Sequence, residues 1–68
     1  MLTPREKEIL KLLCGGKSNK EIGHALDISR FTVKSHLKSI FFKMGVNDRT
    51  QASVTALRQG LVDLDNLA

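Results

Sequence analysis

Residues 18–45, SNKEIGHALDISRFTVKSHLKSIFFKMG, contain two helix starts separated by a short break in the apolar pattern. Ser18 is followed three residues later by glutamate, the spacing of a capping box, and Ser29 can cap a second helix after the break. Apolar residues recur at helical spacing behind each cap, and a glycine closes the stretch. We therefore predict helices over about residues 19–26 and 30–44, joined by a turn of roughly three residues as in a helix-turn-helix.

One further helix is predicted on each side of this stretch. Residues 3–6, TPRE, form another capping box with proline at the first helical position, and a pair of glycines ends that helix. Asp48 can cap a last helix, which Gly60 ends. The predicted helices span about residues 4–14, 19–26, 30–44 and 49–59. No segment shows the alternation of a strand, so the predicted fold class is all-α, a four-helix helix-turn-helix domain.

The chain is short, basic and of ordinary globular composition. It has 68 residues, 41% of them hydrophobic and 26% charged, and a formal net charge of +4. We therefore expect residues 1–68 to form a single domain that is too small for a deep catalytic cleft, and we expect no enzymatic activity. A positive surface favours polyanions such as nucleic acid, although the position of the charges says more than their total.

Several kinds of site and location are disfavoured by the sequence. Cys14 is the only cysteine, so we expect no internal disulfide and interpret it as a small buried apolar residue. His24 and His36 do not have metal-ligand spacing with it, so we expect no metal and no cofactor. No apolar run approaches the roughly 20 residues of a membrane span, and no signal peptide precedes the first helix. We therefore expect no membrane association and a cytoplasmic location.

The predicted helix 30–44 separates apolar and basic residues onto opposite faces. On a helical wheel the apolar side chains that point one way are Val33, Leu37, Ile40, Phe41 and Met44. The side chains that point the other way are Phe31, Lys34, Ser35, Lys38 and Phe42. Residues 28–47 contain no acidic residue, whereas solvated lysine faces usually mix both signs. The basic face therefore favours a recognition helix in the major groove of DNA over a simple solvated surface.

The order of several short motifs is more specific than any of them alone. They are residues 2–6 (LTPRE), 18–22 (SNKEI), 32–37 (TVKSHL), 43–46 (KMGV), 49–52 (RTQA) and 60–61 (GL). Over about residues 2–62 they resemble the LuxR-type helix-turn-helix family, the DNA-binding end of many bacterial response regulators and quorum-sensing regulators. The resemblance implies the output domain of a transcription regulator, as the C-terminal fragment of a longer protein. It also implies double-stranded DNA and RNA polymerase as partners.

The resemblance further implies which residues meet DNA. Base contacts are expected from Lys34, Ser35 and Lys38, and lysine can donate to guanine O6 and N7. Phosphate contacts are expected from Asn19, Lys20, Ser29, Arg30, Thr32 and Lys43. Helix N-termini and hydroxyl groups suit phosphate oxygens. Family members commonly form a homodimer on DNA through the last helix, and the contact is expected at Val54, Leu57 and Arg58.

Three residues depart from those that the family usually has. Phe31 either touches a thymine methyl group, as a further base contact, or packs under the turn against Leu26 or Ile28. Phe42 either packs on a partner, such as a receiver domain or a regulatory protein, or is partly sheltered beneath the N-terminal arm. Gly23 stands where alanine is common, and glycine costs a helix roughly 0.5–1 kcal/mol. We interpret this glycine as a position that eases a close approach of another stretch of backbone.

The last predicted helix carries two apolar strips. Ala52 and Ala56 are small and four residues apart, which suits close packing on the core. Val54 belongs to the other strip and is the member that we expect to be exposed for a dimer contact. Leu57 and Leu61 lie on the same strip, and we expect both to belong mainly to the core.

Two other functions compete with the regulator interpretation. A sigma-factor region 4 module shares the opening motif and the helix-turn-helix, but it normally ends with its recognition helix, unlike a chain with a helix at 49–59. A protein-interaction module on the same scaffold is favoured by Phe31 and Phe42 and disfavoured by the acid-free basic face.

Overall fold

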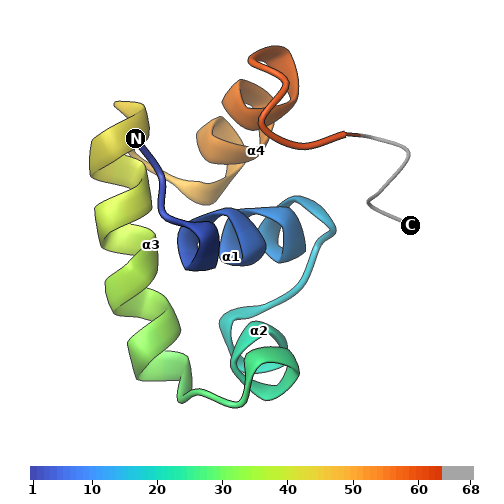
Figure 1. The fold of residues 1–68 in the computed structure, drawn as a ribbon, viewed down its shortest axis with the longest axis vertical. Coiled ribbons are helices and arrows are strands. Elements are labelled where there is room, and N and C mark those ends of the chain that lie inside the picture. The colour runs from blue at the N-terminus through green and yellow to red at the C-terminus, as the bar shows by residue number, and fades with distance from the viewer. Residues whose placement is uncertain (64–68) are drawn as a thin grey trace.

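The computed structural model describes residues 1–63, which form four helices and no strand. The helices are α1 (Pro4–Cys14), α2 (Asn19–Leu26), α3 (Arg30–Met44) and α4 (Arg49–Arg58). In Figure 1, α1 crosses the middle of the molecule, α2 and α4 lie toward opposite ends, and the long α3 runs along one side. The predicted all-α fold is confirmed, and the predicted bounds differ only at the end of α4, by one residue.

Side-chain caps begin α1 and α2 as the sequence predicts. Thr3 Oγ1 accepts from the Glu6 backbone N–H at 3.1 Å, and Glu6 Oε1 accepts from the Thr3 N–H at 2.8 Å. Ser18 and Glu21 make the same reciprocal pair, at 3.1 and 2.8 Å. Each box satisfies two backbone donors that a helix end would otherwise leave to water.

The turn between α2 and α3 is tight and closes directly over Gly23. Asp27 adopts the left-handed conformation with φ 57°, and the Ile28 N–H donates to the Gly23 carbonyl at 2.9 Å. A Cβ atom placed on Gly23 would lie 2.6 Å from the Ile28 carbonyl oxygen, well inside van der Waals contact. Glycine at this position is therefore required by the close approach of the turn. The sequence pattern had indicated this approach without showing which atoms make it.

The hydrophobic core lies around α1, which contacts each of the other helices. Its buried side chains are Ile9, Leu10, Leu13, Ile22, Val33, Leu37, Ile40, Ala52 and Ala56. Every helix contributes to it, and each fully buried leucine or isoleucine stabilises the fold by about 1.5–3 kcal/mol. The two alanines bring α4 close to α1, as the sequence predicts.

The connection from α3 to α4 is determined by a glycine at the end of α3 and a side-chain cap at the start of α4. Gly45 takes the left-handed conformation with φ 70°, and the Val46 N–H donates to the Phe41 carbonyl at 3.0 Å. This is the pattern that closes a helix end and reverses the chain. Asp48 then caps α4 by accepting from the Gln51 N–H at 2.8 Å.

One ion pair joins α1 to the C-terminal half of α3. Lys43 Nζ lies 2.8 Å from Glu6 Oε1, and the Ser39 hydroxyl donates to Glu6 Oε2 at 2.9 Å. The Glu6 side chain is 5% exposed and the Lys43 side chain 32% exposed, so water reaches the pair from the lysine side. The hydrogen bonds from Lys43 and from the Thr3 backbone lower the pKa of Glu6 from 4.5 to about 2. The carboxylate is therefore charged in the folded state across the usual pH range.

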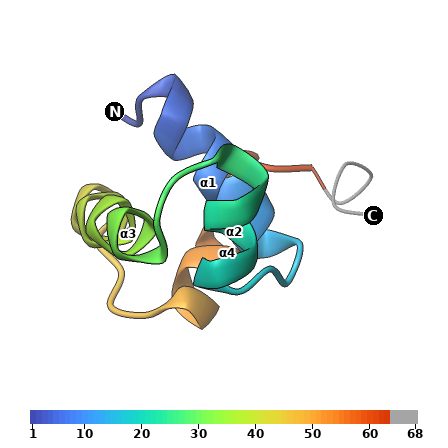
Figure 2. The same cartoon turned by 90° about the horizontal axis from the view of Figure 1, so that it is seen from below.

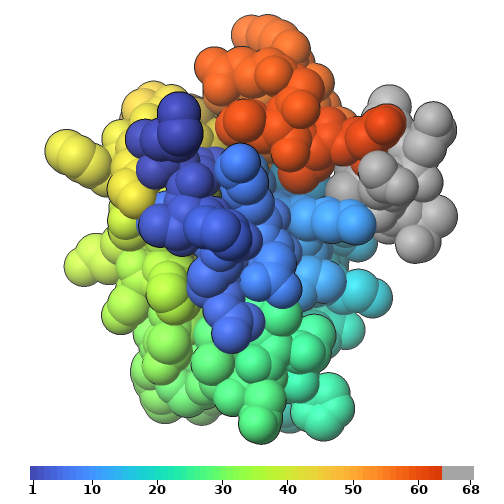
Figure 3. All heavy atoms as spheres, viewed as in Figure 1, coloured from blue at the N-terminus to red at the C-terminus, as the bar shows by residue number. Residues whose placement is uncertain are grey.

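The four helices leave α3 as one flank of the molecule. Figure 2 looks nearly along the axis of α3, which stands to one side of the other helices. In Figure 3 the side chains of α3 form the green-to-yellow left edge of the surface. Within residues 1–63, none of the helices has the length and apolar character needed to cross a membrane.

Candidate nucleic-acid interface

The outward face of α3 carries basic and polar side chains and no acid. Lys34, Ser35 and Lys38 are exposed, whereas Val33 and Ile40 on the opposite face are fully buried. The predicted division of this helix into an apolar and a basic face is therefore confirmed. A helix of this kind has the width and charge that suit the major groove, in which donors on the side chains meet acceptors on the base edges.

Two phenylalanines share this outward face. Phe31 is 70% exposed and Phe42 is 87% exposed. The alternative in which Phe31 packs under the turn is wrong, because the ring points into solvent and the Arg30 guanidinium lies over it, 5.3 Å from its centroid. The alternative in which the N-terminal arm shelters Phe42 is also wrong at this exposure. Neither ring belongs to the hydrophobic core that residues 1–63 form.

The first turn of α3 presents hydroxyl groups and free backbone N–H groups. Ser29 Oγ accepts from the Thr32 N–H at 3.0 Å and lies 3.0 Å from Thr32 Oγ1. Both residues are exposed. An exposed helix N-terminus with two hydroxyls is suited to a phosphate oxygen, which agrees with the predicted role of these residues.

A shallow groove connects the start of α2, the middle of α3 and the start of α4. Its lining includes Asn19, Lys34, Leu37, Lys38, Phe41, Asn47, Asp48 and Arg49. Three residues that we selected from sequence, from two different helices, are therefore brought together along one surface. Lys20 is exposed but lines a different hollow, beside the end of α1.

Arg49 is a charged groove residue that sequence reasoning did not select. Its Nη2 donates to the Lys17 carbonyl at 2.7 Å, and its Nη1 lies 3.4 Å from Asn19 Oδ1. The guanidinium thus ties the start of α4 to the loop before α2. A cation in the first turn of a helix opposes the helix dipole, and this cost was the available signal that Arg49 serves another purpose.

Lys43 does not lie with the other predicted phosphate ligands. Its ammonium group is engaged by Glu6, on the side of α3 that faces α1. Its position therefore indicates a structural role in place of the predicted phosphate contact.

The apolar strip formed by α4 and the segment just after it is more exposed than we predicted. Val54 is 48% exposed, as expected, but Leu57 at 36% and Leu61 at 40% are exposed as well. The assignment of the two leucines mainly to the core is therefore wrong, because the alanines of α4 take the positions against α1. Arg58 is exposed at the end of the same helix. The result is a short, partly exposed apolar strip of Val54, Leu57 and Leu61.

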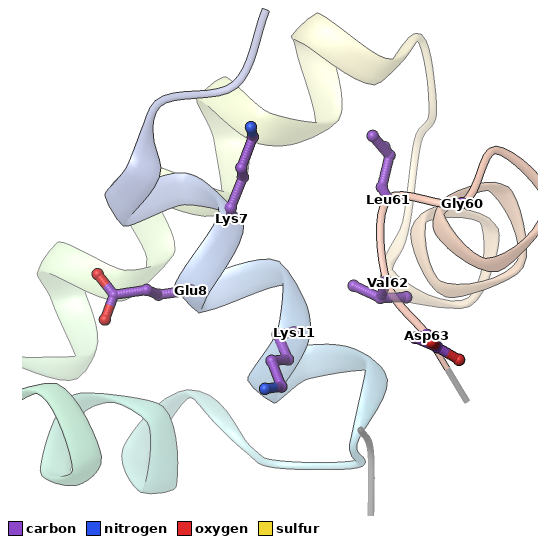
Figure 4. A pocket seen from close by; sticks show the side chains of 7 residues that line it. All are labelled: Lys7, Glu8, Lys11, Gly60, Leu61, Val62 and Asp63. Atoms are coloured by element: carbon purple, nitrogen blue, oxygen red, sulfur yellow. The ribbon is translucent and has the colours of Figure 1, made fainter. Parts of the chain in front are cut away.

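A hollow on another side of the molecule and the thiol of Cys14 lie apart from the face of α3. Figure 4 shows a hollow between α1 and the segment after α4, lined by Lys7, Glu8, Lys11, Gly60, Leu61, Val62 and Asp63, with no residue from α3. Cys14 is half-buried, and this burial raises the pKa of its thiol, which disfavours the reactive thiolate. Residues 1–63 contain no group of three His, Cys, Asp or Glu side chains placed to hold a metal ion.

Comparison with known proteins places this geometry in context. A model of the family described as bacterial regulatory proteins, luxR family, matches residues 1–56. The transcriptional regulatory protein DegU of Brevibacillus brevis is 53% identical over 62 residues, covering 91% of this chain and 26% of DegU. The transcriptional regulatory protein LiaR of Bacillus subtilis is 55% identical over 62 residues, covering 91% of this chain and 29% of LiaR. The chain thus spans between a quarter and a third of these relatives.

Two solved structures show the same fold. The response regulator ChrA of a heme-sensing two-component system superposes with a TM-score of 0.87 at 45% identity, covering 91% of this chain and 31% of that chain. The transcription factor GerE superposes with a TM-score of 0.85 at 44% identity, covering 94% of this chain and 96% of GerE. The second comparison matches almost the whole of the solved GerE chain.

Proposed function

Because the chain belongs to the luxR family of bacterial regulatory proteins, we propose that it binds specific double-stranded DNA sequences with α3 in the major groove. The observation that carries this proposal is the outward face of α3, where Lys34, Ser35 and Lys38 are exposed and no acid is present. DNA-binding helix-turn-helix domains of this family act within transcription regulators, and no enzymatic step is needed for this role.

The base contacts come from the middle of the exposed face. Lys34 and Lys38 are one helical turn apart, so their ammonium groups reach neighbouring base pairs along the groove. Each ammonium donates to guanine O6 or N7, and the Ser35 hydroxyl donates or accepts. Phe31 adds an apolar contact at the start of the helix.

The phosphate contacts flank the base contacts on both sides. They come from Asn19, Lys20, Ser29, Arg30 and Thr32. The exposed starts of α2 and α3 direct backbone N–H groups and side chains toward the strands that border the groove. Arg49 holds Asn19 and the loop before α2 in place, so its effect on the phosphate contacts is indirect.

A second copy of the domain binds an adjacent half-site. Val54 and Leu57 form the apolar contact between two α4 helices, and the exposed Arg58 borders it. Two copies would lie about one helical turn of DNA apart, roughly 34–36 Å. As the output domain of a transcription regulator, the pair would present its free surface to RNA polymerase.

A protein-interaction role is the second candidate, and Phe42 favours it. Its ring is 87% exposed at the end of α3, beyond the part of the helix expected in the groove. This role is compatible with DNA binding, because the two surfaces occupy opposite ends of the same helix.

Selection from a random DNA pool at moderate salt tests the proposed function. We expect the wild-type domain to enrich a short motif, and we expect Lys34→Ala/Lys38→Ala to lose it. The matched control is Lys7→Ala/Lys11→Ala, which removes the same charge from exposed positions of α1 and should enrich the same motif. If the control loses the motif as completely as the α3 variant, total charge and not the face of α3 carries the binding.

A further inference from the structure

Phe31 and Arg30 form a stacked pair at the exposed start of α3. The guanidinium carbon of Arg30 lies 5.3 Å from the centroid of the Phe31 ring, which is the geometry of a cation–π contact. The ring is 70% exposed and is absent from the side chains packed on the core. An exposed aromatic ring that adds nothing to the core is available for a contact outside the domain.

The direction of the ring points to DNA as the partner. Phe31 precedes Ser35 by four residues and Lys38 by seven, so all three share one strip of α3. The ring therefore faces the same way as the proposed base-reading side chains. It also lies in the first turn of the recognition helix, and the N-terminal residues of such helices contact the base edges.

We propose that Arg30 and Phe31 act together to recognise thymine, with the ring packed on the C5-methyl group and the guanidinium on a neighbouring phosphate. This proposal rests on the proposed function, and it assigns one base of the recognised sequence to two named residues. The contact is specific, because thymine is the one base of the four that presents a methyl group in the major groove. Arg30 holds the ring by stacking and, in the same position, carries the charge that a phosphate attracts.

Replacement of thymine by deoxyuridine tests the methyl contact. Deoxyuridine removes the methyl group and leaves the hydrogen-bonding pattern of the base unchanged. In the motif obtained by selection, we expect deoxyuridine at one position of each half-site to weaken wild-type binding about three- to tenfold per half-site, as the loss of one buried methyl contact implies. Phe31→Ala should weaken binding to the thymine duplex by a similar factor and should not distinguish thymine from deoxyuridine.

The matched aromatic control is Phe42→Ala, which removes the other exposed ring of α3. This variant should keep the full preference for thymine over deoxyuridine. Because both rings are exposed, neither substitution should lower the melting temperature by more than a few degrees, and that measurement separates a binding defect from unfolding.

Two substitutions of Arg30 separate its charge from its planar group. Arg30→Lys keeps the charge and loses the flat guanidinium, so it should reduce the preference for thymine while the salt dependence of binding stays as in wild type. Arg30→Ala should reduce the preference and also lower the slope of log affinity against log salt by about one per half-site.

The outcomes distinguish this proposal from the one on which it rests. A motif whose affinity is unchanged by deoxyuridine at every position overturns the thymine contact and leaves the proposed function intact. The same conclusion follows if Phe31→Ala weakens all sequences equally, since the ring would then contact the sugar-phosphate backbone. If no motif is enriched by the wild-type domain, the proposed function fails, and the thymine contact fails with it.

Discussion

Glu6 combines a local and a long-range role in one carboxylate. It caps α1 through the Thr3 backbone and binds Lys43 and Ser39 of α3. Hydrogen bonds to a charged group contribute about 1.5–3 kcal/mol each when the partner is removed, so the orientation of the recognition helix depends strongly on this residue. The sequence predicted the cap, because a cap depends on residues three apart. It could not predict the contact with Lys43, which is 37 positions away.

We expect Glu6→Gln to lower the free energy of unfolding by roughly 2 kcal/mol, because the ion pair and the charge-assisted bonds are lost. Thermal or urea unfolding measures this effect. Glu8→Gln is the control, since Glu8 is exposed on the same helix. Equal destabilisation by both substitutions would show that the charge of α1, and not the Glu6 contacts, is responsible.

The pH dependence of the stability of the fold should reveal the contribution of the Glu6 carboxylate. The pKa of Glu6 is about 2 in the folded state, against 4.5 as its ordinary value, so folding favours the charged form. Its contribution is therefore fully present above about pH 4.5 and is lost as the pH falls from 4.5 toward 2. Melting temperatures measured across this range should fall more steeply for wild type than for Glu6→Gln. Parallel curves would contradict the assignment.

At the scale of the elements, the caps and glycines explain why the helix bounds were predictable. Capping boxes and left-handed glycines act within a few residues, so their effect is visible in the sequence. Exposure along α4 and just after it was not predictable in the same way, because the four-residue spacing of Leu57 and Leu61 fits either a core or a dimer strip. Arg49 was missed because its partners lie about thirty residues away.

The helix-turn-helix itself should tolerate no branched side chain at Gly23. Gly23→Val would place its Cβ near 2.6 Å from the Ile28 carbonyl oxygen and would force the turn away from α2. We expect a loss of several kcal/mol, on the order of other overpacked core sites, and a lower melting temperature. His24→Val is the control for the helix propensity of valine, because His24 is exposed on the same helix. A similar loss in both variants would mean that the turn yields without cost.

For the whole molecule, affinity should depend on two domains acting on one DNA. Val54→Asp places a charge in the proposed strip between the α4 helices. We expect this variant to bind a single half-site as wild type does and to lose at least tenfold in affinity for an operator with two half-sites. Electrophoretic mobility on the two duplexes measures both. Unchanged binding to the double site would exclude α4 as the dimer contact.

The salt dependence of DNA affinity should also reflect the binding of two domains. If roughly five to eight phosphates are neutralised per dimer, the slope of log affinity against log salt is about −4.5 to −7. Lys20→Ala should lower the magnitude of this slope and weaken all sequences by similar factors, whereas Lys38→Ala should weaken mainly the preferred motif. A change of motif in the Lys20 variant would contradict its assignment to phosphate.

The close contact between Gly23 and the turn has a consequence for how this domain can change in evolution. A methyl group at position 23 needs a displaced Ile28 carbonyl, and a displaced turn leaves an unfilled gap beside a glycine. Substitutions at the two places are therefore expected to compensate each other, with each harmful alone. Relatives that carry alanine at this position should have a turn that is displaced from the helix before it.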